Sequence, residues 1–290
     1  MIRLVSVRYA ALCLAGVGSS VAAPSPATVR AQGAAPFVYT PGAQQYRITT
    51  VTKRTQDQSG GRAPFEFEVT TTQYVTVRIT SAGHDTLGVA IAMDSLAVAS
   101  TLDALPADTD GFKGTVLRGT MSPQGRMYAF EAPAGTQPGK VTALYRAFRP
   151  FLVPFPSTAM APGLTWTDST VDHIEKKPFS ITSTSVTTWT VTGDTTYAGQ
   201  KAWRVERVAI VTTSGTGTEG TMPLHLEGDD TIRGVRYVTM GGVYVGGSAT
   251  QTSLLQMNTQ VGADQSESSP IRQTIKTTIQ PLSMLRTAGS

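Results

Sequence analysis

The chain has 290 residues, 40% of them apolar, and a formal net charge of +4 at pH 7. This apolar content is enough to build a core and excludes wholesale disorder. Three arginines among residues 1–31 carry most of the positive charge, so the composition gives no case for nucleic-acid binding, which needs a clustered basic face. The 44 threonines favour strands over helices, because a β-branched side chain suits a pleated, half-buried surface.

Residues 1–31 have the pattern of a secretory signal peptide. Arg3 and Arg8 precede a run of small apolar residues, Ala10 to Ala23, that is short for a membrane span. Small side chains at positions 29 and 31 favour cleavage after Ala31; the alternatives are a buried N-terminal helix and a retained anchor. The only cysteine, Cys13, lies in this segment, so the mature chain would have no disulfide. We expect an exported protein, periplasmic or extracellular.

A flexible leader at residues 32–45 precedes the first β-rich half, residues 46–137. Alternating apolar residues predict strands over 46–55 and 65–80, with a hairpin turn after the second. Residues 87–100 fit a strand or a helix, and the alternation of Val89, Ile91 and Met93 favours the strand. Two shorter strands flank the Ser-Pro-Gln-Gly turn that ends at Gly125.

A short helix and a proline-rich crossover, together residues 138–164, are predicted to join the two halves. Apolar residues have helical spacing over 138–149, and Pro150 ends the pattern. The second β-rich half is predicted over 165–282, with a tail at 283–290. It contains a long hairpin with Gly193 expected in the turn, and its last strand starts near Ile271.

One sequence pattern of the first half recurs in the second. Residues 117–130 and 226–239 share a Leu, two Gly and a Tyr at the same spacing: Leu117, Gly119, Gly125 and Tyr128 against Leu226, Gly228, Gly234 and Tyr237. A duplicated meander would place these glycines in equivalent turns, and the alternative is chance in a sequence of low diversity. The predicted fold is all-β: two related antiparallel β-meanders that form a curved sheet, half-barrel or clam, with one short connecting helix.

Residues 162–168, at the end of the crossover, resemble a known class of bacterial proteins. Pro162, Gly163, Trp166, Thr167 and Asp168, with Ser-Pro-Gln-Gly-type turns, resemble uncharacterised secreted bacterial β-rich proteins grouped under domains of unknown function. More distantly, the layout is similar to the half-barrel lipoprotein carriers of the bacterial envelope, in which a strongly curved antiparallel sheet holds acyl chains against helices. The resemblance implies an envelope protein that binds an apolar ligand.

Three groups of polar residues are candidates for metal or catalytic sites. His225, Glu227 and Asp229 alternate on one face of a predicted strand and are the ligands that the sequence offers a divalent cation, although a solvated charged turn is the expected interpretation. Asp168, Asp172, His173 and Glu175 are interpreted as a strand edge protected by charge. His84 beside Asp85 fits local hydrogen bonding in a turn, and the chain has no nucleophile elbow. We expect no catalytic residues and no cofactor.

Aromatic residues supply the candidate binding site. Trp189 and Trp203 flank one predicted hairpin and are expected to meet across it or to pack in the core. The sharper hypothesis is an apolar pocket between the halves, lined by Trp166, Trp189, Trp203, Tyr197 and Tyr237. Phe151, Leu152, Val153 and Phe155 are candidates for an exposed apolar surface that binds a partner.

These features favour an exported, non-catalytic binding or scaffold protein of the envelope that holds a lipid or other apolar small molecule between its halves. The alternative is a periplasmic accessory subunit docked on a membrane protein complex, such as an electron-transfer assembly. An exposed apolar surface at 151–156 would favour this alternative. An enzyme is the third hypothesis, and clustering of His173 or His225 with acidic residues in a cleft would favour it. No nucleic-acid partner is expected.

Overall fold

The computed structural model describes residues 36–57, 63–83, 85–102, 112–131, 152–176, 178–219, 222–260 and 266–285, and these form one antiparallel sheet of eleven strands. In chain order the strands are β1 (Gly42–Gln56), β2 (Phe65–Ser81), β3 (Leu87–Ser100), β4 (Val116–Met121), β5 (Met127–Glu131), β6 (Thr165–Lys176), β7 (Phe179–Tyr197), β8 (Gln200–Glu219), β9 (Met222–Thr239), β10 (Tyr244–Gln260) and β11 (Ser266–Leu285). The predicted helix at 138–149 and the signal sequence at 1–31 lie outside the described residues. Within those ranges, no helix has the length and hydrophobicity needed to cross a membrane.

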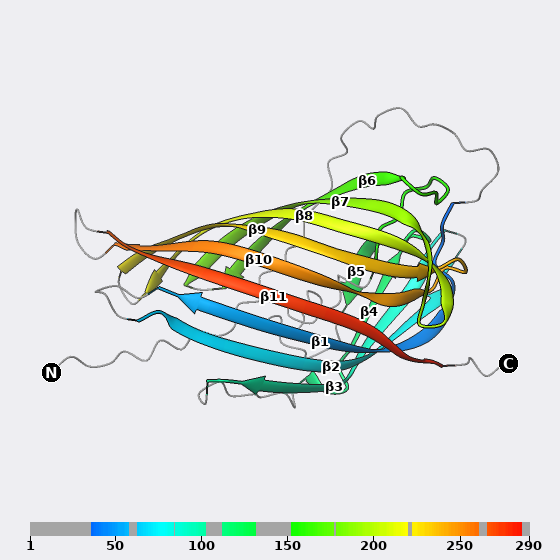
Figure 1. Ribbon diagram of the computed structural model, residues 1–290, viewed down its shortest axis with the longest axis horizontal. Coiled ribbons are helices and arrows are strands. Elements are labelled where there is room, and N and C mark those ends of the chain that lie inside the picture. Colours follow the sequence, from blue (N-terminus) through cyan, green and yellow to red (C-terminus); the bar gives the residue numbers. More distant parts are fainter. Residues whose placement is uncertain are drawn as a thin grey trace.

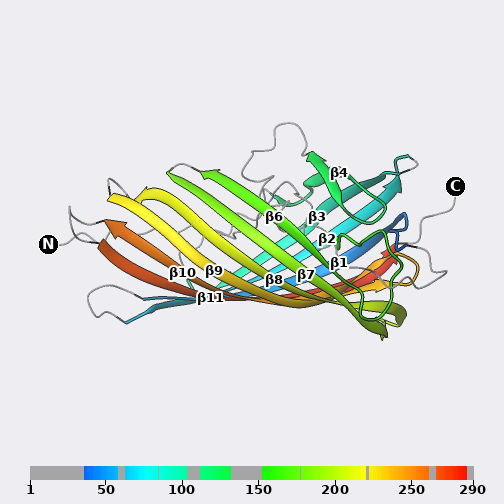
Figure 2. The same cartoon turned by 90° about the horizontal axis from the view of Figure 1, so that it is seen from above.

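The strand order makes the fold two meanders fused into one sheet. The order is β5-β4-β3-β2-β1-β11-β10-β9-β8-β7-β6, so the first and last strands of the chain pair at its centre and β5 and β6 are its edges. The sheet curves strongly from edge to edge (Figures 1 and 2). The all-β prediction and the curved antiparallel sheet are therefore confirmed. The clam alternative, with two separate sheets, is wrong.

The two faces of the sheet follow from strand alternation. Ile48 of β1 pairs with Ile279 of β11 and both are buried, whereas their neighbours Arg47 and Gln280 are exposed on the other face. Buried apolar residues from β1, β3, β4, β7, β8 and β11 contribute to one apolar cluster. Because β4 and β7 lie near opposite edges of the sheet, a cluster that joins them must occupy the concave face.

Two irregular segments close one end of this concave face. Residues 36–41 and 152–164, here called the closing segments, run between the sheet edges and pair with each other at Pro36 and Ala159. The Phe155 N–H donates to the Gln124 carbonyl in the β4–β5 turn (2.9 Å), and the Val191 N–H of β7 donates to the Leu164 carbonyl (2.9 Å). The closing segments therefore bridge the gap between β5 and β6 at this end.

The turn between β4 and β5 shows how tightly the closing segments pack. Gly125 has φ +89°, a conformation that L side chains rarely adopt, and a Cβ at this position would collide with the Tyr39 ring and the Val153 carbonyl. Tyr39 of the first closing segment joins it to the second: its hydroxyl accepts from the Val153 N–H (2.9 Å) and donates to the Val153 carbonyl (3.2 Å). Only glycine fits at this turn.

The recurring sequence pattern does not correspond to a repeated hairpin. Residues 117–130 form β4, a turn and β5, but residues 226–239 lie inside the single strand β9. Gly125 turns the chain, whereas Gly234 is an interior strand residue paired with Ala249 of β10. The glycine of the second predicted turn is also misplaced: Gly193 lies at an irregularity within β7, and the β7–β8 turn is made by Ala198 and Gly199 at φ +48° and +76°.

Candidate functional site

Trp166 and Trp189 lie together on the concave face, at the border of the apolar core. They are paired across β6 and β7, and their rings stack with centroids 6.3 Å apart and planes 15° apart. The Trp166 Nε1–H donates to the Pro154 carbonyl (2.8 Å), and its ring packs on Phe155 (5.7 Å). Trp166 is therefore held by the closing segment.

Trp203 does not meet Trp189, so the predicted pairing across the hairpin is wrong. The register places Arg207 opposite Trp189, and Asp194 and Val238 opposite Trp203. Trp203 instead packs against the apolar core from β8. An irregularity in β7, between Val191 and Gly193, shifts the pairing near this end of the hairpin.

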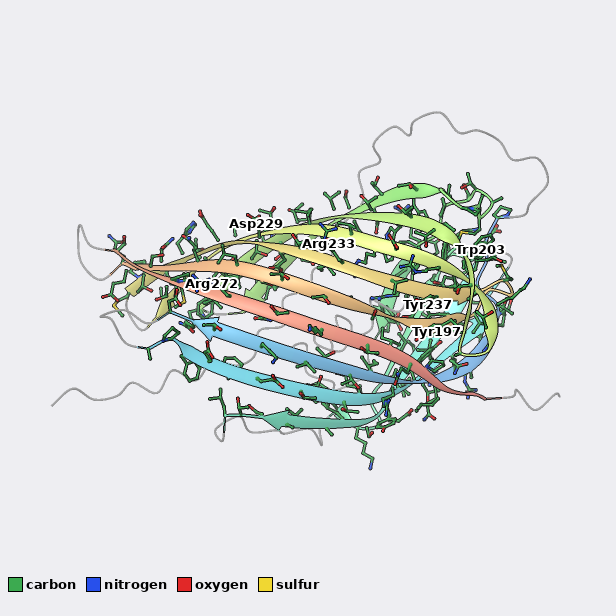
Figure 3. All side chains as sticks on the ribbon, in the orientation of Figure 1. Tyr197, Trp203, Asp229, Arg233, Tyr237 and Arg272 are labelled. Atoms are coloured by element: carbon green, nitrogen blue, oxygen red, sulfur yellow. The ribbon has the colours of Figure 1, made fainter. Side chains whose placement is uncertain are left out.

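Tyr197 and Tyr237, which are labelled in Figure 3, lie on the convex face. Tyr237 alternates with the buried Arg236 and Val238, so it points away from the core. The Tyr197 ring, from the tip of the β7–β8 hairpin, stacks on it at 4.0 Å and 9°. Burial, and secondarily the neighbouring Tyr237, raises the pKa of Tyr197. The five aromatic residues predicted to line one pocket are thus divided between two faces of the sheet.

The predicted partner surface is buried. Leu152, Val153 and Phe155 belong to the apolar core, and Val153 is completely inaccessible to solvent. Phe151 lies outside the described residues. The prediction of an exposed apolar surface here is wrong because the proline-rich segment turns inward to fill the end of the curved sheet.

His225, Glu227 and Asp229 do share one face of a strand, as predicted, and that face is the exposed convex one (Asp229 is labelled in Figure 3). His225 Nε2 and Glu227 Oε1 are 2.7 Å apart and pair with each other. In the described part of the chain, no three His, Cys, Asp or Glu side chains are placed to hold a metal ion. The solvated interpretation fits this arrangement.

The second acidic patch lies on β6, which is an edge strand as the sequence predicted. His173 and Glu175 are exposed on the convex face, where His173 Nδ1 lies 2.9 Å from the Thr182 hydroxyl. Asp168 and Asp172 have the opposite parity and face the concave side. Charged residues on an edge strand discourage pairing with other chains. His84 is outside the described residues.

A band of polar side chains on the concave face is not predicted by the sequence. It lies between the main core and a second apolar cluster of Leu224, Met257 and Ile271 at the far end. We call it the polar belt and define it by its residues: Asp172 of β6, Ser183 and Thr187 of β7, Arg207 and Thr213 of β8, Asp230 of β9, and Gln251 and Ser253 of β10. Six of these eight, all but Arg207 and Gln251, are buried.

Two hydrogen-bonded pairs order the polar belt. Gln251 Nε2 donates to Asp230 Oδ2 (2.9 Å), and the Ser183 and Thr213 hydroxyls are 2.9 Å apart. Burial raises the pKa of Asp230, whereas the neighbouring Ser253 hydroxyl and the Gln251 amide act in the opposite direction. The carboxyl of Asp230 is therefore partly, not fully, compensated for its loss of solvent.

Cationic side chains lie at the core end of the polar belt. The guanidinium of Arg207 lies over the Trp189 ring, 5.4 Å from its centroid. Arg236, almost completely buried, donates through one terminal nitrogen to the Val235 and Ser248 carbonyls (3.0 and 3.1 Å). Burial raises the pKa of the core residue Tyr244 to about 12, and the Arg236 charge acts in the opposite direction.

Comparison with known proteins gives distant likenesses only. No family model and no curated protein matches the chain. Among solved structures, DynF from the dynemicin biosynthesis pathway of Micromonospora chersina is 10% identical with a TM-score of 0.24, over 93% of this chain and 94% of that one. Salmonella typhi OmpF is 8% identical with a TM-score of 0.29, over 82% and 98%. An outer membrane channel from Pseudomonas putida F1 is 8% identical with a TM-score of 0.21, over 88% and 100%. At these TM-scores none of the three bears on the function of this chain.

Proposed function

We propose that this protein is a non-catalytic binding protein of the bacterial envelope and that its ligand lies on the polar belt. The observation that supports this most directly is the burial of charged and hydrogen-bonding side chains such as Asp172 and Asp230. Buried polar groups cost free energy, and apolar residues of similar volume would fill a purely structural interior at least as well. The envelope location rests on the signal-peptide pattern of residues 1–31 and on the resemblance to secreted β-rich proteins.

The expected lipid or apolar ligand fits this surface less well than a polar one. The apolar part of the concave face is covered by the chain itself, through Phe37, Tyr39, Val153 and Phe155 of the closing segments. A lipid chain would have to displace these packed side chains. The polar belt instead carries carboxylate, guanidinium, amide and hydroxyl groups, and its Arg207 and Gln251 side chains are partly exposed.

Native mass spectrometry tests the proposal on full-length protein exported by its own host and purified under mild conditions. We expect the mature chain with one additional small-molecule mass. Arg207→Gln, within the polar belt, should reduce the occupied fraction, whereas Arg233→Gln on the exposed convex face of β9 (Figure 3) should not. Protein without any additional mass, and no rise in Tm when a host small-molecule extract is added, would overturn the proposal.

A second candidate, the docked accessory subunit, is supported by one feature of the convex face. Val186 of β7 and Ile210 of β8 are directly opposite each other and are 47% and 50% exposed. Val171 and Val208 extend this exposed apolar patch over β6–β8. If it binds a membrane complex, Ile210→Asp should abolish co-purification with membrane subunits, and Thr184→Asp on the same face should not. Equal recovery with both variants would exclude this use of the patch.

A further inference from the structure

Two hydrogen-bonding atoms of the concave face have no partner among the described residues. They are the Oδ1 acceptor of Asp230 and the Nε1–H donor of Trp189. Both residues are buried, with 5% and 6% of their surface exposed, respectively. Buried polar atoms are almost always paired in folded proteins, and each one left unpaired is costly. The pair therefore indicates a ligand that both donates and accepts hydrogen bonds.

The contacts around Trp189 leave its indole edge as the part that can meet a ligand. Trp166 of β6 stacks on the ring from one side of β7, and the Arg207 guanidinium of β8 lies over the ring from the other side. The strands on either side of β7 thus each place a side chain against the Trp189 ring. A ligand meets the Nε1–H at the edge rather than stacking on the ring.

The contacts around Asp230 fix one of its carboxyl oxygens. Gln251 Nε2 donates to Oδ2 (2.9 Å) and also lies 3.3 Å from the Ser253 hydroxyl. The carboxyl group is therefore held in one orientation by its β10 neighbours, with Oδ1 left as the acceptor. A ligand group that donates a hydrogen bond to Oδ1 would complete the hydrogen bonding of the carboxyl.

The charge on the concave face favours a neutral ligand. Its described side chains include the carboxyls of Asp168, Asp172 and Asp230 and the guanidinium groups of Arg54, Arg207 and Arg236. An anion placed along this face meets the carboxyls, and a cation meets the guanidinium groups. Hydroxyl groups accept from guanidinium and indole N–H groups and donate to carboxylates, so a polyhydroxylated neutral molecule matches both.

The spacing of the two atoms sets the length of the ligand. Trp189 and Asp230 are two strands apart, and the register offsets them by four residues, because Trp189 pairs with Arg207 and Asp230 pairs with Val211. Strand spacing and rise then separate their Cα atoms by roughly 16 Å. Inward-pointing side chains shorten this span, but it still exceeds a single sugar ring.

We infer that the polar belt binds a neutral oligosaccharide in which one hydroxyl donates a hydrogen bond to Asp230 Oδ1 and another oxygen accepts a hydrogen bond from Trp189 Nε1–H. This inference rests on the proposed binding function and names its ligand class. Arg207, Thr213 and Gln251 lie between or beside the two anchor residues and supply further hydrogen-bonding groups along the sugar chain.

The test uses the purified full chain on an array of neutral tri- and tetrasaccharides built from glucose, mannose, galactose and N-acetylglucosamine, with sialylated and sulfated counterparts. We expect binding to one or more neutral members, followed by titration calorimetry with the best of them. Trp189→Phe removes the Nε1–H and keeps the ring contacts, and Asp230→Asn removes the charge. Each should weaken binding by about tenfold or more, as expected for a lost hydrogen bond to a buried or charged group.

Asp229→Asn is the matched control, because Asp229 is the next residue on β9 and is exposed on the convex face (Figure 3). It should leave the affinity unchanged, and near-ultraviolet circular dichroism should show all three variants folded. Selective binding to charged glycans, binding unaffected by both concave variants, or no binding to any neutral glycan would overturn the inference. A lipid mass in the native spectrum that Arg207→Gln reduces would overturn the oligosaccharide class and leave the binding function supported.

Discussion

Replacing Phe155 by Ala should lower the free energy of unfolding by about 4 kcal/mol. Phe155 is 6% exposed, and its ring centroid lies 4.0 Å from that of Phe37 and 5.7 Å from that of Trp166. Removing a buried Phe side chain costs about 3–5 kcal/mol, and each aromatic contact contributes about 0.5–1.5 kcal/mol beyond its buried area. The expected loss lies above the lower end of this range, since the ring contacts with Phe37, Tyr39 and Trp166 disappear together.

The surrounding structure leaves little freedom to collapse into the space. The Phe155 N–H is bonded to the Gln124 carbonyl (2.9 Å), and Val153, two residues earlier, is held by the Tyr39 hydroxyl through both its N–H and its carbonyl. Cavities that cannot relax are the more costly ones. Phe155 also joins the closing segments to each other and to β6, so its loss weakens the closed end of the sheet.

Urea denaturation followed by far-ultraviolet circular dichroism measures this change, and thermal unfolding gives a second readout. At roughly 2–4 °C per kcal/mol for a chain of this size, Tm should fall by about 8–16 °C. Val38→Ala is the control, because Val38 lies on the neighbouring closing segment and is 47% exposed; it should change stability by less than about 0.5 kcal/mol. A loss below about 1.5 kcal/mol for Phe155→Ala would mean that residues 152–156 are not packed in the core and would restore them as a candidate partner surface.

Three further predictions concern Asp230 in the polar belt and Tyr39 and Gly125 at the closed end of the sheet. Asp230→Asn should raise the free energy of unfolding at pH 7, because burial raises the pKa of this carboxyl and its ionisation therefore destabilises the fold. The gain over the wild type should shrink as the pH falls towards the ordinary Asp value of 3.8, and denaturation at pH 4 and pH 7 tests this against Asp229→Asn. Tyr39→Phe should cost about 1–3 kcal/mol in urea denaturation because it leaves the buried Val153 N–H unpaired; an unchanged midpoint would contradict this. Gly125→Ala should cost more than about 1 kcal/mol, from a left-handed backbone and a collision with Tyr39, and a wild-type Tm would refute that account.

Strand content was predictable because local alternation encodes it. The run Val89, Ile91 and Met93 faces the core as its period of two required, and residues 87–100 form the strand that this alternation favoured over a helix. The edge position of β6 was also predictable from its charges. These signals reside within one strand and its immediate sequence neighbours.

Pairing partners and faces were less predictable because they depend on contacts distant in sequence. The glycines at 125 and 234 look equivalent in sequence, yet one turns a hairpin and the other sits inside a strand, since neighbouring strands decide which role a glycine takes. The apolar run at 152–156 has the same composition whether exposed or buried. Only the curvature of the sheet, which leaves an end to be filled, determines that these residues turn inward.

The polar belt escaped sequence analysis for a related reason. In β7, Ser183 and Thr187 face the polar belt, while Thr182 and Thr184 face the convex side. Because both faces carry small hydroxyl residues, the alternation of residue types along the strand does not distinguish them. The sign that distinguishes the two faces is burial, which appears only when eleven strands curve together.

The distribution of apolar and polar residues along the concave face argues for a division of roles. The closed end carries the large apolar cluster and the closing segments, which fix the curvature by joining both edges of the sheet. The polar belt adds little to that task, because its buried carboxyls and hydroxyls stabilise the fold less than apolar side chains of similar volume would. A protein that needed only a shape would gain stability by replacing Asp230 and Asp172 with apolar residues. Their burial beside an unpaired carboxylate oxygen of Asp230 is what a surface built to hold a polar molecule requires.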